Sequence, residues 1–360
     1  PGSGLFLFIG ALILNVTLSM NLKKTYDQDL KSIFYTANVI KQCLALSKLE
    51  GTPELDVNFN HFKTSRRFSG FLAKIESPDF VTSSILFVKL IFMIDYVLFH
   101  LIQHSYFKHQ DEVTKCYDYI STLDNHYSLA MYRRTLSYYC EPDIDESVGG
   151  VHFQNLIHPL IDEDVAVPND LNLDNHILLT GSNASGKSTF MKAVALNIIM
   201  SQSLRTATAD TFKCKPGYVY TSMANADDVL SGDSYFMAEL KSIRRLFNID
   251  TQGTIYCFID EIFKGTNTTE RIAASESVLS YLNALPNYQV VAATHDIELS
   301  SLLERDYHNY HFNESINNNE IYFDYKIKPG KANTRNAIEL LRITQFPNAI
   351  YERAKEQVKE

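Results

Sequence analysis

Hydrophobic and polar positions follow two different patterns along the chain, and the change between them lies near residue 143. From about Lys23 to Tyr139 there is little Gly or Pro, and apolar residues recur three and four positions apart. The clearest series is Leu86, Leu90, Met93, Ile94, Val97, Leu98 and Leu101. This spacing is typical of long helices that pack against one another. We therefore predict an all-α region over residues 23–142, with turns near residues 50–53 (EGTP) and 77–78 (SP).

Beyond residue 142, short β-like runs alternate with helical stretches. The runs are HILLT at 176–180, TIYCFID at 254–260, QVVAAT at 289–294 and IYFDYKI at 321–327. Strands that alternate with helices favour a mostly parallel sheet with helices on its faces. The pattern predicts an α/β domain over residues 143–360, and 360 residues are enough for two folded units.

Residues 1–22 form an apolar segment. Pro1 to Ser3 are typical of a cloning remnant, and residues 5–22 contain 18 positions without a charge before Lys23 and Lys24. A transmembrane helix needs roughly 20 mostly apolar residues, and lysines suit its cytoplasmic end. Polar side chains make the second half of the segment less apolar than the first. Two alternatives therefore stay open, the remnant of a membrane span or a helix buried against a core or a partner chain.

Composition and charge exclude several classes of protein. With 45% hydrophobic, 12% aromatic and 21% charged residues, the chain is neither disordered nor fibrous. The formal charge of −9 argues against a surface that is basic throughout, although Lys63, Arg66 and Arg67, or Arg133 and Arg134, could form a local patch for a DNA backbone. The five cysteines are odd in number and contain no CxxC pair, which favours a reducing, cytoplasmic compartment.

A motif for binding nucleotide phosphates follows the first apolar run. Residues 181–188, GSNASGKS, match GxxxxGK[ST], with a strand expected before them and a helix after them. In this motif glycines let backbone N–H groups approach the phosphates, Lys187 reaches the β- and γ-phosphates, and the Ser188 hydroxyl ligates Mg²⁺. The predicted ATP-binding residues are Gly181, Ser182, Asn183, Ala184, Ser185, Gly186, Lys187, Ser188 and Thr189.

Two further elements complete a hydrolytic site. Asp260 and Glu261 end an apolar strand, where one carboxylate can hold Mg²⁺ and the other can orient or deprotonate the attacking water. His295 ends the next strand, where it can sense the γ-phosphate. We predict Glu261, His295 and Lys187 as catalytic residues and Ser188 and Asp260 as metal ligands.

These elements occur in two classes of ATPase that dimerise over nucleotide, transporter cassettes and mismatch-repair proteins. The segment LSGDS at 230–234 superficially resembles the transporter signature. Transporter cassettes, however, usually place a proline after the acidic pair and have the signature closer to it, whereas here Ile262 follows Glu261. The transporter interpretation is therefore the weaker one.

Several segments together resemble the ATPase domain of the MutS family. GSNASGKST (181–189), ADDVLSGDSYFMAEL (226–240), FIDEIFKGTNTTER (258–271), ATHDIEL (293–299) and the closing stretch 325–354 are similar to family motifs in the same order, and PND at 168–170 precedes them. Residues 120–134, CEP at 140–142 and HPLI at 158–161 resemble the end of the family's lever helix and its entry into the ATPase domain.

The resemblance implies a homodimer with each nucleotide held between two subunits. Ser234 would then contact the γ-phosphate bound by the other chain, Asn183 would help to place phosphates or water, and Gly265 and Thr266 would pack across the dimer. The departures from the family are also informative. The roughly 120 residues before the match leave no room for a mismatch-reading domain, and Thr269 to Arg271 replace the family's usual tyrosine and aspartate. The sequence ends at Glu360, where family members often continue into a helical dimerisation tail.

The function we expect is that of a Mg²⁺-dependent MutS-type ATPase that couples its nucleotide state through helices to a DNA structure. The alternative is a divergent, membrane-tethered ATPase that is anchored through its N-terminal segment and acts on an unknown protein partner without binding DNA. Salt-sensitive DNA binding by the helical region would distinguish the two.

Overall fold

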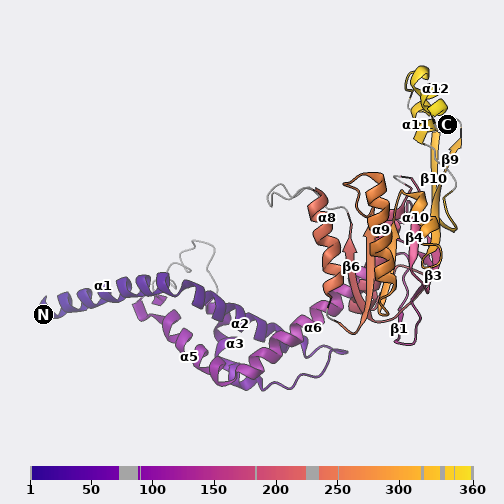
Figure 1. Cartoon of the computed structure of the whole chain (residues 1–360). Coiled ribbons are helices and arrows are strands. Elements are labelled where there is room, and N and C mark those ends of the chain that lie inside the picture. Colours follow the sequence, from indigo (N-terminus) through magenta and orange to yellow (C-terminus); the bar gives the residue numbers. More distant parts are fainter. Residues whose placement is uncertain are drawn as a thin grey trace. The chain divides into compact units, whose positions relative to one another are not determined.

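The computed structural model describes residues 2–72, 88–89, 91–182, 185–223, 235–249, 251–317, 320–332, 337–343 and 345–357. The chain divides into two compact units, Pro1–Met131 and Tyr132–Glu360 (Figure 1). The domain limits expected at residues 22 and 142 stay predictions.

The first unit is helical in the residues described. Its elements are α1 (Gly2–Thr25), α2 (Asp27–Leu46), η1 (Phe59–Phe62), α3 (Lys63–Leu72), α5 (Ile94–Lys108) and α6 (Gln110–Thr135), whose last residues belong to the second unit. Its core brings α2, η1 and α6 together through Ile40, Cys43, Phe62, Cys116 and Tyr119. The turn expected at 50–53 falls in the irregular segment after α2, and the one at 77–78 lies outside the described residues.

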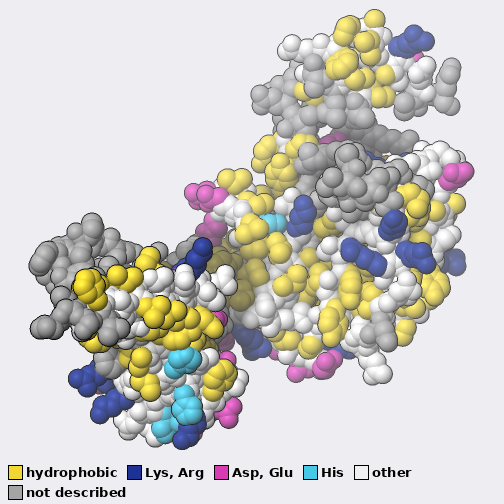
Figure 2. Space-filling model, turned by 90° about the vertical axis from the view of Figure 1, so that its left-hand side faces the viewer, with side chains coloured by type: hydrophobic (Ala, Val, Ile, Leu, Met, Phe, Trp, Pro, Cys, Tyr) yellow, Lys and Arg dark blue, Asp and Glu magenta, His cyan; other side chains and the backbone are white. Residues whose placement is uncertain are grey.

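The hydrophobic series used to predict the helical packing is only partly buried. In α5 the buried side chains are Leu98, Phe99 and Ile102, whereas Val97 and Leu101 are 54% and 57% exposed. Leu86 and Leu90 lie outside the described residues. Leu98 of the series is buried while Val97 and Leu101 are exposed, because apolar residues occur on several sides of α5 and packing covers only one of them. Figure 2 shows hydrophobic side chains spread over one face of this unit.

The N-terminal apolar segment forms α1, where Phe6, Phe8 and Leu14 are exposed. Among the described residues, no helix has both the length and the apolar character needed to cross a membrane.

The second unit is built around a six-stranded sheet. Its strands are β4 (Ile177–Thr180), β6 (Gly217–Ser222), β7 (Thr254–Asp260), β8 (Tyr288–Ala293), β9 (His308–Asn317) and β10 (Glu320–Pro329), in the order β10-β9-β4-β8-β7-β6. All neighbours are parallel except β9 and β10. The predicted mixed α/β fold with a mostly parallel sheet is therefore confirmed, and each predicted strand matches an observed one.

Alternate residues of the central strands enter two separate cores. In β7, Tyr256 and Phe258 pack in one core with α7 (Lys187–Leu204), whereas Ile255 and Cys257 pack in the other. The second core also contains residues of α9 (Thr268–Asn283) and α10 (Ile297–Leu302). Helices on both faces explain why these central strands are apolar throughout, because both of their sides are buried. The remaining elements are α8 (Tyr235–Arg244), η2 (Arg245–Asn248), α11 (Ala337–Ile343) and α12 (Asn348–Gln357).

A smaller sheet, not predicted from the sequence, packs in the same core as α7. It has the order β1-β5-β2-β3, formed by β1 (Asp143–Ile144), β2 (Val151–Leu156), β3 (Asn169–Leu173) and β5 (Thr211–Cys214). Strand β2 runs antiparallel to both neighbours. The alternation of buried and exposed residues along β2 is irregular, because its register against β3 shifts between Phe153 and Leu156. The sequence of β2 therefore does not show the period of two that is typical of a strand.

Candidate functional site

The loop after β4 lies at the carboxyl edge of the large sheet, beside the ends of β7 and β8. In the sheet order, β8 lies between β4 and β7, so the loops that follow these three parallel strands meet at one edge. Gly181 and Gly186 in the first loop have φ of +142° and +107°. A Cβ on Gly181 would lie 2.9 Å from the Phe312 carbonyl oxygen, so both the backbone angle and the available space require glycine there.

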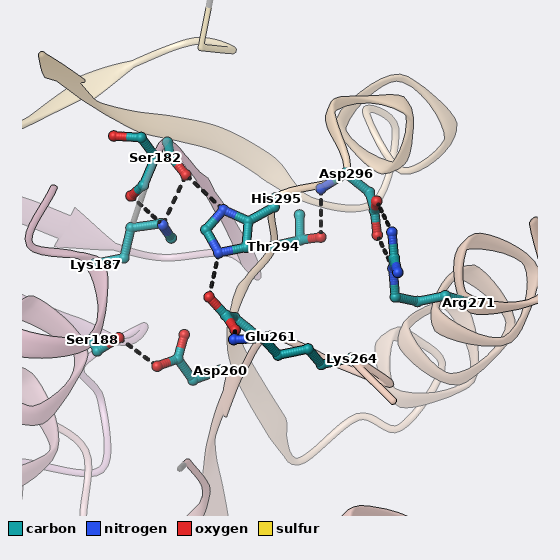
Figure 3. A network of polar contacts seen from close by, with 11 residues as sticks. Ser182, Lys187, Ser188, Asp260, Glu261, Lys264, Arg271, Thr294, His295 and Asp296 are labelled. Atoms are coloured by element: carbon teal, nitrogen blue, oxygen red, sulfur yellow. Dashed lines mark hydrogen bonds and ion pairs between the residues drawn. The ribbon is translucent and has the colours of Figure 1, made fainter. Parts of the chain in front are cut away.

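Lys187 turns back over this loop (Figure 3). Its Nζ donates hydrogen bonds of 2.8 Å to the carbonyls of Gly181 and Ser182, and the residue is 4% exposed. Burial lowers its pKa, and the nearby carboxylates of Asp260 and Glu261 act in the opposite direction. A positive charge is thus held where the motif predicts nucleotide phosphates.

The two predicted metal ligands lie together. The Ser188 hydroxyl donates to Oδ2 of Asp260 across the boundary between α7 and β7. The other oxygen, Oδ1, is buried and has no hydrogen-bond partner among the described residues. An oxygen of this kind suits a divalent cation, and Mg²⁺ is typically bound by one or two carboxylates together with phosphate oxygens. The donor set therefore fits Mg²⁺.

Glu261 and His295 meet across the ends of β7 and β8. Nε2 of His295 contacts Oε1 of Glu261, and its Nδ1 lies 3.1 Å from the Gly181 carbonyl oxygen. Glu261 has φ of +54°, which is uncommon for a residue with a side chain and often marks a functional site. Burial acts to raise the pKa of Glu261, but hydrogen bonds from Lys264 and His295 outweigh it, so its pKa is lowered. The group is a carboxylate at neutral pH and can accept a proton.

Two residues missed by the sequence reasoning support Glu261. Lys264 forms an ion pair with Oε2 of Glu261. Glu239 of α8 is 4% exposed, and its Oε1 accepts from the backbone N–H groups of Phe263 and Lys264. Burial raises the pKa of Glu239. Glu239 lies within the segment that resembled a family motif, but nothing local to it indicates that it contacts the loop after β7.

A cavity of about 400 Å³ opens beside the start of α7. Its polar lining comes from Ser185 to Thr189 and Glu261, and its apolar lining from Leu156, Ile161, Val165, Val167, Phe312 and Tyr325. Asn169 connects two segments of this lining, because its side chain donates to the Tyr325 carbonyl at 3.0 Å and accepts from the Ile327 N–H. The apolar lining was also missed, since it comes from segments far apart in the chain.

The remaining predicted residues differ in where the described structure places them. Asn183, Ala184 and Ser234 lie outside the described residues. Thr189 is exposed and lines the cavity, while Thr266 Oγ1 donates to Glu270 at 3.3 Å. The roles of all predicted site residues stay predictions.

The proposed basic patch at Arg133 is engaged within the protein. Its guanidinium donates to the Arg205 carbonyl at 2.8 Å and to the Thr206 hydroxyl at 2.9 Å. Arg133 is thus bound to the end of α7, and its neighbour Arg134 is exposed.

A second group of possible metal ligands lies in the helical unit. The ligand atoms of His61, His109 and Glu112 lie within 4.8 Å of one another. The two imidazoles stack with their centroids 3.8 Å apart and an interplanar angle of 15°. Because an imidazole lone pair lies in the ring plane, nearly parallel stacked rings do not point at one shared ion.

The chain is similar to proteins of one named family. The family model described as MutS domain V matches residues 177–360. The chain is 29% identical over 276 residues to a DNA mismatch repair protein MutS of Staphylococcus epidermidis, covering 73% of this chain and 31% of that protein.

Two further relatives carry the same name. The protein of Fusobacterium nucleatum is 32% identical over 279 residues, covering 74% of this chain and 31% of the relative. That of Lactobacillus helveticus is 32% identical over 232 residues, covering 61% and 27%. The chain thus spans less than a third of the length of these relatives.

Proposed function

The chain belongs to the MutS family, and from this premise we propose that it is a Mg²⁺-dependent ATPase whose nucleotide state controls a dimer and, through its helices, binding to DNA. Membership itself suggests ATP hydrolysis and a role related to mismatch repair, since the relatives are named DNA mismatch repair proteins. The metal dependence, the dimer and the DNA partner are our proposals.

One observation carries the proposal. Three groups meet where the loops follow parallel strands β4, β7 and β8. They are Lys187 after the phosphate loop, the Ser188–Asp260 pair, whose Oδ1 has no described hydrogen-bond partner, and the Glu261–His295 pair. A phosphoryl-transfer site needs these groups, which are a cation for the phosphates, ligands for Mg²⁺ and a residue that orients water.

Each residue has a distinct role in the proposed mechanism. Backbone N–H groups of residues 181–189 and the start of α7 bind the phosphates, and Lys187 leaves the Gly181 and Ser182 carbonyls to reach the β- and γ-phosphates. Ser188 and Asp260 hold Mg²⁺, which would neutralise charge that develops on the phosphates. Glu261 orients the attacking water and accepts its proton, while His295 donates to the γ-phosphate.

The apolar lining of the cavity is suited to the nucleotide base. Phe312 and Tyr325 belong to it together with aliphatic side chains, and both lie beside Gly186 of the phosphate loop. A flat aromatic ring system can be buried against these side chains while its phosphates bind the loop.

Two chains complete the site in the proposed dimer. Ser234 of one chain would contact the γ-phosphate held by the other, and Gly265 and Thr266 would pack across the interface. ATP then favours the closed dimer, and hydrolysis releases it, because the γ-phosphate contacts exist only before hydrolysis.

The first test is ATP hydrolysis with and without Mg²⁺, measured as phosphate release. Lys187→Ala should abolish hydrolysis and weaken ATP binding, because the phosphates lose a buried cation. Glu261→Gln should reduce kcat by at least about a hundredfold while keeping ATP affinity, so that ATP accumulates on a dimer visible by light scattering. Glu352→Gln, an exposed glutamate of α12, is the matched control and should behave as wild type. Hydrolysis by Glu261→Gln at the wild-type rate would show that another group activates water.

The same assay distinguishes the DNA partner from the alternative. Plain, mismatched and branched duplexes are added at low and moderate salt. A change in ATPase rate with one DNA form supports the DNA-coupled function, with an effect that weakens as salt rises. A rate that no DNA changes would favour the alternative of a membrane-tethered ATPase that acts on a protein partner.

A further inference from the structure

A charged pair outside the predicted nucleotide contacts clamps the loop that carries His295. Arg271 lies in the first turn of α9, and its Nε and Nη2 donate to Oδ2 and Oδ1 of Asp296, each at 2.7 Å. Figure 3 shows the guanidinium pointing from α9 towards this loop. Two parallel N–H···O bonds fix the relative orientation of both groups, unlike a single contact.

The pair is shielded from solvent. The side chains of Arg271 and Asp296 are 22% and 11% exposed, respectively. Exposed ion pairs contribute little because water and salt screen them, whereas shielded bidentate pairs hold their geometry. The arrangement is therefore suited to fixing a loop.

The side chain of Asp296 does not make the hydrogen bond that is usual for an aspartate at a helix N-cap. Asp296 is the N-cap of α10, where an aspartate normally accepts a hydrogen bond from the helix's first N–H groups, yet its side chain makes no such bond. Its carboxylate binds Arg271 instead, and its backbone N–H donates to the Thr294 hydroxyl at 3.1 Å. The residues on both sides of His295 are thus held in place.

The other side of the guanidinium faces the loop after Glu261. Nη1 of Arg271 lies 3.4 Å from the Thr266 carbonyl oxygen, and Nη2 lies 3.4 Å from the Thr268 hydroxyl. Arg271 therefore links the segment that follows Glu261 to the segment that contains His295. These two segments supply the two side chains that meet at the site.

We propose that Arg271 and Asp296 are a positioning pair that sets His295 against Glu261 and the γ-phosphate for ATP hydrolysis. Neither residue touches the substrate in this proposal, which rests on the function proposed above. Thr266 is expected at the dimer interface, and Arg271 connects it to Asp296, the neighbour of His295. Closure of the dimer would therefore change the position of His295.

The test compares substitutions on both sides of the pair. Arg271→Gln and Asp296→Asn should each lower kcat about tenfold and leave the dissociation constant of a fluorescent ATP analogue within about twofold, because misplacement of His295 affects the reaction rather than binding. The double variant should be no slower than either single one, since both remove the same contact. Arg271→Lys keeps the charge without the fork and should fall between Arg271→Gln and wild type.

The experiment also includes a control variant and a measurement on His295 itself. Lys213→Gln removes an ion pair to Asp143, at 3.2 Å in the small sheet, and should leave kcat unchanged. The ring resonance of His295, assigned by its loss in His295→Gln, should shift in Arg271→Gln and Asp296→Asn and not in Lys213→Gln. This NMR measurement needs no hydrolysis.

Two results would overturn the inference. One is wild-type kcat with an unmoved His295 resonance in Arg271→Gln. The other is a loss of kcat, nucleotide affinity and thermal stability in equal measure, which would indicate only a structural pair. If the wild-type chain does not hydrolyse ATP, the proposed function fails, and the resonance alone then decides whether the pair positions His295.

Discussion

At the scale of single residues, the site depends on backbone conformations that only certain side chains tolerate. Gly181 and Gly330 both have positive φ, +142° and +95°. A Cβ on Gly181 would meet the Phe312 carbonyl oxygen, whereas one on Gly330 would meet no atom of the described residues within 4 Å. The two positions therefore separate the cost of the backbone angle from the cost of crowding.

Gly181→Ala should lower the free energy of unfolding by about 1–3 kcal/mol more than Gly330→Ala does. Both variants carry the strain of a left-handed backbone, but only the first also pushes a methyl group against a buried carbonyl. Urea unfolding followed by circular dichroism measures the difference. Equal losses would mean that the loop moves away from Phe312 at little cost.

At the scale of elements, the last turn of α6 is joined to the helix that follows the phosphate loop. Arg133 in the last turn of α6 donates to carbonyls at the end of α7, Leu204 at 3.4 Å and Arg205 at 2.8 Å. The last carbonyls of a helix have no partner within it, so a cation that binds them stabilises both elements. This contact joins the predicted phosphate-binding helix to the predicted lever helix.

Arg133→Ala should lower the free energy of unfolding of the second unit by about 1–3 kcal/mol, because carbonyls and a hydroxyl lose a charged donor. Arg134→Ala is the matched control, since Arg134 is the exposed neighbour on the same turn, and should change stability by less than about 0.5 kcal/mol. Chemical denaturation of both variants measures this, and equal stability of the two would contradict it.

At the scale of the whole molecule, the half-buried His176 makes stability depend on pH. His176 begins the loop into β4, where its Nδ1 accepts the Val290 N–H at 3.0 Å and its ring packs against Tyr307. Burial lowers the pKa of His176, and Asp306 opposes this only in part. Below pH about 6.5 the unfolded chain binds a proton that the folded chain does not, so the folded state is stabilised less as pH falls.

His176→Asn should therefore reduce the loss of stability between pH 7.5 and 5.5, since the amide oxygen keeps the acceptor for Val290 and does not titrate. One proton contributes at most about 1.4 kcal/mol per pH unit to that slope. His308→Asn, at an exposed histidine, is the comparison. Unfolding midpoints across the pH range give the slopes, and an unchanged slope in His176→Asn would exclude this histidine as a cause.

The pattern of residues along the chain was enough to predict the mixed fold and four strands of the large sheet, which the structure confirms. The same pattern predicts that the chemistry takes place at the ends of β4, β7 and β8, and this remains a prediction. These features can be predicted locally, because the period of a strand and the spacing of a motif each involve only a few neighbouring residues. Parallel strands then bring their carboxyl ends to the same edge of the sheet.

The side chains that come together at the candidate site from distant parts of the chain became known only from the folded structure. Val167 and Tyr325 line the same cavity, Glu239 accepts hydrogen bonds from the loop after β7, and Arg271 donates to Asp296. The buried side of α5 was also decided there, since several of its faces are apolar. Contacts of this kind follow from strand order and from competition among packing partners, and neither leaves a pattern in the residues next to them.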